Sequence, residues 1–145
     1  TQYIRHHSKP EFTPEPDVVH EVIGHVPMFA NKALVEFSAM VGRAAKKATE
    51  KQIEQLSRLY WYTVEYGLIR ENGEIKAFGA GLLGGIQDLQ NAFGAEALIK
   101  DFDLQEVINT DYTYSFVQPH FFVISSFESL REQTKTFLND MSSKE

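Results

Sequence analysis

The chain has 145 residues, of which 43% are hydrophobic and 23% charged, a balance typical of one folded domain and not of a disordered chain. Its 14 basic and 20 acidic residues give a formal net charge of -6, which disfavours a nucleic-acid-binding protein because such proteins usually present a basic face. No apolar run approaches the roughly 18 residues of a membrane span, so we expect a single cytoplasmic domain over residues 1–145 that contacts neither nucleic acid nor membrane.

The N-terminal part of the chain predicts an extended segment followed by a helix. Residues 1–13 lack a periodic apolar pattern. Pro16 followed by Asp17 is a helix-start signal, because proline lacks the N–H that would be unpaired there and a carboxylate suits a helix N-terminus. This helix should run to about residue 25, since Pro27 stops it soon afterwards.

Two longer helices are predicted next. Asn31 is a suitable N-cap for a helix with one apolar stripe. The stretch Thr49–Gln52 is typical of a capping box and predicts a helix through about Leu68. The apolar stripe of the first of these helices consists of Leu34, Phe37, Val41 and Ala45.

The second half of the chain predicts short strands between helices. Asn72-Gly73 indicates a turn beside the alternating segment Ile75–Phe78. Gly79–Gly84 matches GxGxxG, but no βαβ unit surrounds it, so we interpret it as a glycine-rich loop beside a pocket. The other candidates are helices at 86–93 and 103–108, strands at 112–116 and 121–124, and a last helix after the capping-box stretch Ser125–Glu128. The fold class is therefore mainly α with a few short β-strands.

A pair of histidines stands out in the first helix. His20 and His25 are five residues apart, unlike the four-residue spacing of the HExxH motif. On an α-helical wheel their side chains are about 140° apart, with Gly24 between them. Because Gly24 has no side chain, a group held by both imidazoles would have room there. Alternatively, the two histidines lie on an exposed polar face, and the glycine allows close helix packing. The opposite face of the wheel carries Val18, Val19, Val22 and Ile23.

Glu65 is the only charged residue in the apolar and aromatic stretch Leu59–Ile69. A buried carboxylate is expensive unless it is paired, protonated or bound to metal, and a salt bridge with Arg58 or Arg70 would be the ordinary reason for one. Since the chain has no Cys, a metal ion would need His and carboxylate ligands. Two His and one carboxylate form the facial triad of non-haem iron oxygenases, and zinc hydrolases use the same set, so the ligand types leave both chemistries open.

Several motifs together resemble the pterin-dependent aromatic amino acid hydroxylases, and within that family the bacterial phenylalanine hydroxylase branch. The resemblance covers essentially the whole chain. The matching segments are Thr1–His6, Thr13–Asp17, His20-Glu21, Gly24–Pro27, Trp61–Leu68, Ala77–Leu83 and Gln118-Pro119.

The resemblance implies a site and its cofactors. Fe(II) would be bound by His20, His25 and Glu65, and the co-substrates would be a tetrahydropterin and O2. The implied reaction is hydroxylation of an aromatic amino acid, phenylalanine to tyrosine. Tyr60 beside the iron and Glu21 on the pterin side are the implied catalytic residues, and the implied substrate-binding residues are Arg5, Thr13, Pro16, Trp61 and Gly81.

The chain departs from the family pattern in two ways. Gly84-Gly85 stands where mammalian-type sequences have Ser-Ser, so a hydroxyl group that positions the substrate is missing. The family's catalytic domain also begins well before Thr1, so we expect this chain to be the C-terminal portion of such a domain, with much of the pterin-binding part upstream. The alternatives are a zinc metallohydrolase that uses the same three ligands and a non-catalytic helical fragment.

Overall fold

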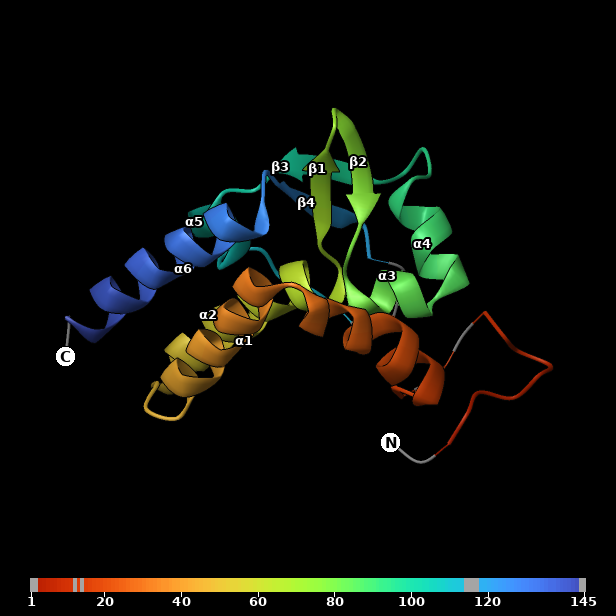
Figure 1. The fold of residues 1–145 in the computed structure, drawn as a ribbon, viewed down its shortest axis with the longest axis horizontal. Helices are drawn as coiled ribbons and strands as arrows, with labels where there is room; N and C mark the ends of the chain where they lie inside the picture. Colours follow the sequence, from red (N-terminus) through yellow and green to blue (C-terminus); the bar gives the residue numbers. More distant parts are fainter. Residues whose placement is uncertain (1–2, 12, 14, 114–117, 144–145) are drawn as a thin grey trace.

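The computed structural model describes residues 3–11, 13, 15–113 and 118–143. It is mainly helical with one small sheet, which confirms the predicted fold class (Figure 1). The helical elements are the π-helix η1 (His20–His25), the 3-10 helix η2 (Val26–Ala30), α1 (Lys32–Ala45), α2 (Glu50–Tyr60), the π-helix η3 (Trp61–Glu65), α3 (Ala80–Gly84), α4 (Ile86–Ala92), α5 (Leu104–Val107) and α6 (Phe127–Ser142). The strands are β1 (Leu68–Glu71), β2 (Glu74–Ala77), β3 (Leu98–Asp101) and β4 (His120–Ile124).

The four strands form one mixed sheet in the order β2-β1-β4-β3. β1 and β2 are an antiparallel hairpin, and its turn residues Asn72 and Gly73 have φ values of 53° and 84°, as a tight hairpin turn requires. β4 is buried and parallel to both β1 and β3. The strand predicted at 121–124 is thus confirmed, with these two strands as its partners. Most of the strand predicted at 112–116 lies outside the described residues.

The helix caps predicted from the sequence are largely confirmed. The Asn31 side chain accepts a hydrogen bond from the Leu34 N–H, and both hydrogen bonds of the Thr49 capping box are formed. At α6 the cap is the Ser126 side chain, which accepts from the Ser129 N–H. The first helical turn follows Asp17 as predicted, since the Glu21 N–H donates to the Asp17 carbonyl.

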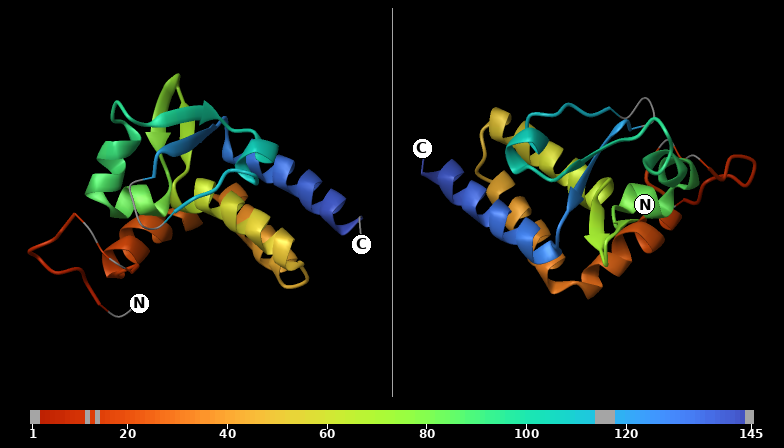
Figure 2. Two further views of the ribbon diagram at one scale, coloured as in Figure 1. Left: turned by 180° about the vertical axis from the view of Figure 1, so that it is seen from behind. Right: turned by 90° about the horizontal axis from the view of Figure 1, so that it is seen from above.

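The main core lies where α1, α2 and α6 meet the sheet (Figure 2). The predicted stripe of α1 points into this core: Leu34, Phe37 and Val41 are buried in it, and Ala45 packs against it. The largest fully buried side chains include Phe37, Leu59, Tyr62, Phe122, Ile124 and Leu130. This core holds the ends of α2 and β1 in place, and with them the segment that carries Glu65.

The structure differs from the prediction at four places. The helix expected to reach Leu68 ends as η3 at Glu65, because Leu68 already pairs with Ala77 and Val123 in the sheet. The expected glycine-rich loop at Gly79–Gly84 contains the helix α3, whose buried small residues pack against η1. β3 was not predicted at all. Pro27 does not end the helical path but lies at the start of η2. Among the described residues, no helix is long and apolar enough to cross a membrane.

Candidate metal centre

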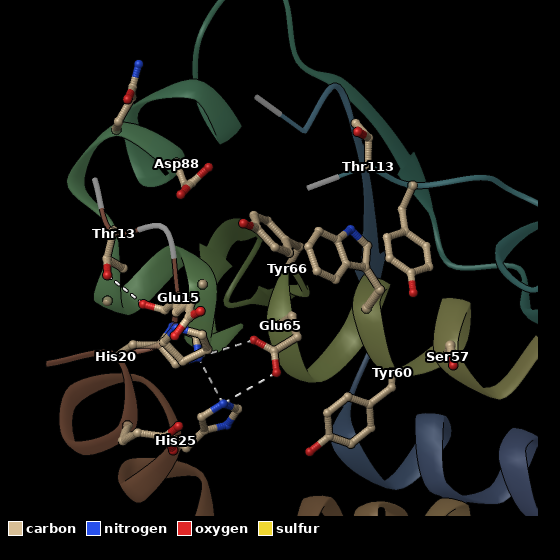
Figure 3. Close-up of a pocket in the computed structure, with 18 of the residues that line it drawn as sticks. Thr13, Glu15, His20, His25, Ser57, Tyr60, Glu65, Tyr66, Asp88 and Thr113 are labelled. Carbon is tan, nitrogen blue, oxygen red and sulfur yellow. Dashed lines mark hydrogen bonds and ion pairs between the residues drawn. The ribbon is translucent and has the colours of Figure 1, made fainter. Parts of the chain in front are cut away.

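His20, His25 and Glu65 converge on one point at the junction of η1 and η3 (Figure 3). The two Nε2 atoms of the histidines are 3.1 Å apart. The carboxylate of Glu65 reaches both, with Oε2 3.5 Å from Nε2 of His20 and Oε1 3.4 Å from Nε2 of His25. Three potential ligand atoms from two distant parts of the sequence thus face a common space.

The π-helical geometry of η1 brings the histidines together. In a π-helix the hydrogen bonds run from residue i to residue i-5, as does the bond from the Val26 N–H to the Glu21 carbonyl. Residues five apart therefore lie near the same side, whereas an α-helix would turn them well away from each other. The 140° separation expected from an α-helical wheel is wrong for this reason.

Glu65 lies in a second π-helix. The Tyr66 N–H donates to the Trp61 carbonyl at 2.8 Å, again five residues back. The buried Thr63 hydroxyl donates to the Leu59 carbonyl at 2.6 Å, which ties the end of α2 to η3. Both segments that carry the candidate ligands are thus π-helical.

Gly24 does not make room for an ion. A Cβ at this position would lie 2.7 Å from the carbonyl oxygen and 2.9 Å from the Cβ of Ala80 in α3. Close helix packing is therefore the reason for this glycine. The alternative that the histidines lie on an exposed polar face is wrong as well, because the side chains of His20 and His25 are only 13% and 22% exposed.

The ionisation of Glu65 follows from its surroundings. Burial alone would raise the pKa of the Glu65 carboxyl, but hydrogen bonds to His20 and His25, aided by their charge, lower it to about 2. The same hydrogen bond raises the pKa of His25 in spite of its burial. The expected salt bridge of Glu65 with a neighbouring arginine is wrong, since Arg58 pairs with Asp111 and Arg70 with Asp101.

The three side chains fit one metal ion. Their ligand atoms all lie within 4.8 Å of one another. Two nitrogen ligands about 2.1 Å from one ion are about 3.0 to 3.4 Å apart at angles between a right angle and the tetrahedral angle. The Nε2–Nε2 separation of 3.1 Å lies within this span, and the carboxylate oxygens of Glu65 lie 3.4 and 3.5 Å from the two nitrogen atoms, close to its upper end. Two imidazoles and one carboxylate are also a suitable donor set for iron or zinc.

A cavity of about 860 Å³ opens next to these ligands. All of the residues proposed from the sequence as substrate-binding or catalytic line its wall. They are Arg5, Thr13, Pro16, Glu21, Tyr60, Trp61 and Gly81. The structure thus brings the ten candidate site residues together, while the role of each remains a prediction.

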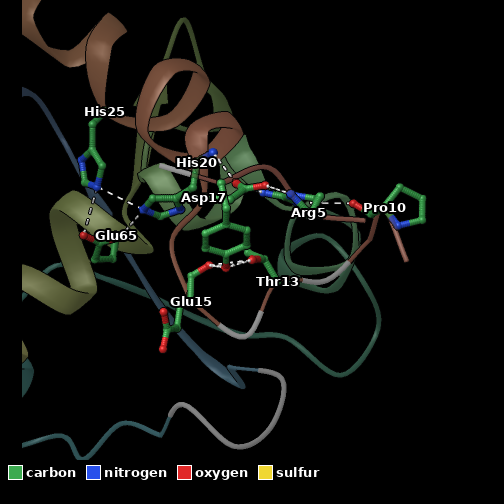
Figure 4. A network of polar contacts seen from close by, with 9 residues as sticks. Arg5, Pro10, Thr13, Glu15, Asp17, His20, His25 and Glu65 are labelled. Atoms are coloured by element: carbon green, nitrogen blue, oxygen red, sulfur yellow. Dashed lines mark hydrogen bonds and ion pairs between the residues drawn. The ribbon is translucent and has the colours of Figure 1, made fainter. Parts of the chain in front are cut away.

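Asp17, which was predicted only as part of a helix start, holds the side chain of Arg5. Nε and Nη2 of Arg5 donate to the two carboxylate oxygens of Asp17 at 2.8 Å each, and Nη1 donates to the Pro10 carbonyl (Figure 4). Asp17 is fully buried, and it also accepts from the backbone N–H of His20 at 2.9 Å. The guanidinium keeps the pKa of the Asp17 carboxyl well below its usual range. Asp17 therefore connects the expected substrate site to the first metal ligand.

The aromatic side chains of the cavity wall contact one another. The Trp61 ring lies between the rings of Tyr66 and Tyr112, each at a centroid distance of 4.6 Å, and its Nε1 donates to Gln118 at 3.1 Å. Burial, followed by the charge of Glu65, raises the pKa of the Tyr60 phenol, so this group stays protonated at neutral pH. Gly81 is needed next to Glu65, since a Cβ would lie 3.0 Å from the Glu65 carbonyl oxygen.

Two polar contacts hold the Thr13 hydroxyl in another part of the cavity wall. It donates to the Glu15 carbonyl at 2.5 Å and lies 2.7 Å from the Tyr3 hydroxyl. Sequence reasoning missed the contributions of Asp17, Tyr66, Asp88 and Gln118 to this region. Asp17 had a signal in the motif Thr13–Asp17, because an acidic residue between prolines and an apolar helix can serve both as a cap and as an arginine partner. Tyr66 and Gln118 stand in the matching segments Trp61–Leu68 and Gln118-Pro119.

Comparison with known proteins agrees with this geometry. The family model described as biopterin-dependent aromatic amino acid hydroxylase matches residues 1–144. The chain is 46% identical over 141 residues to Protein henna of Drosophila melanogaster and 43% identical over 139 residues to tyrosine 3-monooxygenase of Schistosoma mansoni, covering 97% and 96% of this chain. A phenylalanine hydroxylase structure from Chromobacterium violaceum with bound iron(III) and 7,8-dihydrobiopterin matches with a TM-score of 0.86 at 31% identity over 98% of this chain.

The matches cover only part of those proteins. The chain spans 31% of the Drosophila and 30% of the Schistosoma protein, and 53% of the bacterial structure. The shared region contains the whole His, His and Glu constellation of this chain.

Proposed function

The chain belongs to the family of biopterin-dependent aromatic amino acid hydroxylases, and on this premise we propose that it acts in the hydroxylation of phenylalanine to tyrosine with Fe(II), a tetrahydropterin and O2. The observation that carries the proposal is the convergence of His20, His25 and Glu65 beside an aromatic-lined cavity. A family match alone would not require that all three ligand residues be present in this geometry.

The chain's own residues divide into two groups in this proposal. His20, His25 and Glu65 would bind the iron, which supplies the activation of O2 that ring hydroxylation needs. Arg5 would bind the substrate carboxylate, because a guanidinium fixed by a carboxylate partner presents its remaining N–H groups in a fixed direction. Trp61 with Pro16 would bound the space for the aromatic ring.

Four further residues of the cavity wall complete the proposed site. The Tyr60 phenol and the Glu21 carboxylate flank the ligands, and Thr13 with Gly81 would border the bound amino acid. We further propose that residues 1–145 act as one folded unit that corresponds to part of the catalytic domain of the longer relatives. In support, α6 packs on α1 and β4 pairs with β1, so elements from the first and second halves of the chain share one core.

Metal binding tests the centre of the proposal. Protein reconstituted with Fe(II) without oxygen should retain about one ion per chain after desalting, measured by elemental analysis, and Glu65→Ala should lose it because one of three ligands is removed. Glu54→Ala is a matched control on the exposed side of α2 and should retain the iron. Equal metal content in both variants would disprove the ligand set.

Turnover tests the reaction. The reconstituted protein supplied with phenylalanine, a tetrahydropterin and O2 should form tyrosine, detected by chromatography. The zinc hydrolase alternative makes the opposite prediction: zinc-dependent peptide hydrolysis that Glu21→Gln abolishes. Hydrolysis of this kind without tyrosine formation would replace the hydroxylase assignment.

A further inference from the structure

Asp88 is an acidic residue of the cavity wall to which the proposed function assigns no role. It is in the first turn of α4, and its carboxylate lines the same cavity as Arg5 and the metal ligands. The glycine at position 85 leaves space for it, since a Cβ there would lie 2.9 Å from Oδ2 of Asp88. In Figure 3 this carboxylate and the hydroxyl of Tyr66 point into the same part of the cavity.

The negative charge of Asp88 is not compensated within the described part of the chain. None of the hydrogen bonds or ion pairs found among the described residues involves this carboxylate. By contrast, Asp17 binds Arg5, and Glu65 faces two imidazoles. A partly buried carboxylate without a cation or a donor lowers stability. Burial accordingly raises the pKa of the Asp88 carboxyl.

Tyr66 adds a second polar group at the same place. Its ring lines the same cavity as Asp88, and its hydroxyl points toward the space that the Asp88 carboxylate faces (Figure 3). The phenol oxygen also forms no hydrogen bond with any residue that the structure describes. The wall therefore offers a carboxylate and a phenol oxygen, both able to accept a hydrogen bond from a ligand.

A helix-stabilising role explains Asp88 only in part. An acidic side chain in the first turn of a helix interacts favourably with the helix dipole. An acidic residue in this position often also accepts a hydrogen bond from the N-cap N–H, as the Gln52 amide oxygen does at α2, but Asp88 forms no such bond with Gly85. The carboxylate is turned toward the cavity instead.

Arg5 supplies the opposite charge elsewhere on the wall. Within the described residues, three of its five N–H groups are used, two by Asp17 and one by the Pro10 carbonyl. The other two can bind a carboxylate. A cavity with a cationic group and an uncompensated anionic group on its wall matches a zwitterion better than a simple anion.

We propose that Asp88, assisted by the Tyr66 hydroxyl, binds the ammonium group of the amino acid substrate while Arg5 binds its carboxylate. This rests on the proposed function, because it names the recognition of the same substrate. An ammonium group has three donors, so it can be shared by the two carboxylate oxygens and the phenol oxygen. The site would then select free amino acids over aromatic acids that have no amine.

The test compares two ligands that differ in the ammonium group. L-phenylalanine and 3-phenylpropanoate are titrated by calorimetry into Fe(II)-loaded protein without oxygen or pterin, so that no turnover occurs. Asp88→Asn should weaken the binding of phenylalanine by about 10- to 100-fold, as expected for a charge-assisted hydrogen bond, and should leave 3-phenylpropanoate unchanged or slightly tighter. Tyr66→Phe should weaken only phenylalanine, by a smaller factor.

The controls separate this proposal from a structural effect and from the proposed function itself. Asp140→Asn changes an exposed carboxylate of α6 and should leave both ligands unaffected. Unchanged phenylalanine binding in Asp88→Asn, or an equal loss of both ligands, would overturn the ammonium site and leave the proposed function intact. If the wild-type protein binds iron but no phenylalanine, both proposals fail together. Should Asp88→Asn not fold, Tyr66→Phe decides by the same ligand comparison.

Discussion

At the scale of single residues, Asp17 combines two functions in one buried carboxylate. It caps the first helical turn through the His20 N–H, fixes the Arg5 guanidinium with two hydrogen bonds, and is fully buried while doing so. Such a charge is stable inside a protein only because its partners are complete. The orientation of Arg5 toward the cavity thus depends on the same residue as the start of the segment that carries both histidines.

Removal of Asp17 should therefore destabilise the protein strongly. Asp17→Ala leaves the Arg5 guanidinium, whose side chain is only 9% exposed, without its counter-charge, and we expect a loss of about 3 kcal/mol in the free energy of unfolding. Urea denaturation followed by circular dichroism measures it. Asp111→Ala breaks an ion pair whose carboxylate is 88% exposed and should cost under about 1 kcal/mol. Similar losses in the two variants would contradict this account.

The contribution of Asp17 should also depend on pH in a defined direction. Its folded pKa lies below the unfolded value of about 3.9, so the carboxylate stabilises the fold fully above that value and less as the pH falls toward the folded pKa. The stability difference between the wild type and Asp17→Asn should be constant from about pH 5 to 7 and shrink below about pH 4. A difference that grows on acidification would show the opposite sign of the shift.

At the scale of elements, the two π-helices explain why the site could be predicted only in part. The residue types of His20, His25 and Glu65 already indicated a metal site, because imidazole and carboxylate are donors that iron and zinc prefer, and a lone carboxylate in an apolar stretch needs a cation. The α-helical period, however, placed the histidines on different sides. Local propensity does not distinguish a π-helix from an α-helix, whereas the contacts of η1 and η3 with α3 involve residues distant in the sequence.

The errors in the fold have a similar cause. Caps at Asn31 and Thr49 were predictable because their hydrogen bonds are local. β3 was not, since its four residues are all exposed and its strand conformation comes from pairing with β4. Leu68 was assigned to a helix for the same reason: its neighbours in the sheet are far away in the sequence.

The contact between η1 and α3 gives a prediction at this scale. In Gly24→Ala the new Cβ would meet the backbone oxygen of Ala80 at 2.7 Å, and backbone yields less easily than a side chain. We expect a loss of about 2 kcal/mol in stability and weaker iron binding, because the helix between the two histidines must shift. Thermal denaturation and metal titration measure the two effects.

Gly42 offers the matched control for that substitution. It is also a helical glycine, yet a Cβ there meets nothing within 4 Å. Gly42→Ala should therefore stabilise the protein by about 0.5 to 1 kcal/mol, since alanine favours the helix, and should leave iron binding as in the wild type. If both alanine variants behave alike, close packing is not the reason for Gly24.

At the scale of the whole molecule, one stretch of surface departs from the usual distribution of apolar side chains. The apolar face that the wheel assigned to Val18, Val19, Val22 and Ile23 is not packed into the core, since Ile23 is 53% exposed, and in η2 the side chain of Phe29 is 72% exposed. The helix instead packs through Gly24 and its polar side, because the histidines turn inward to Glu65. The exposed apolar residues of this stretch are Val18, Val22, Ile23, Val26 and Phe29.

Several exposed apolar side chains in one short stretch promote self-association, whereas single ones are ordinary on protein surfaces. Phe29→Lys should therefore reduce the binding of a hydrophobic dye and the apparent mass in light scattering, while it changes the free energy of unfolding by less than about 0.5 kcal/mol because the ring is mostly in solvent. Val35→Lys alters an exposed residue of α1, 37% exposed, and should have little effect on either measurement. A loss of stability in Phe29→Lys as large as that of a core substitution would mean that this ring is packed, and that the apolar face of η1 and η2 is buried in solution.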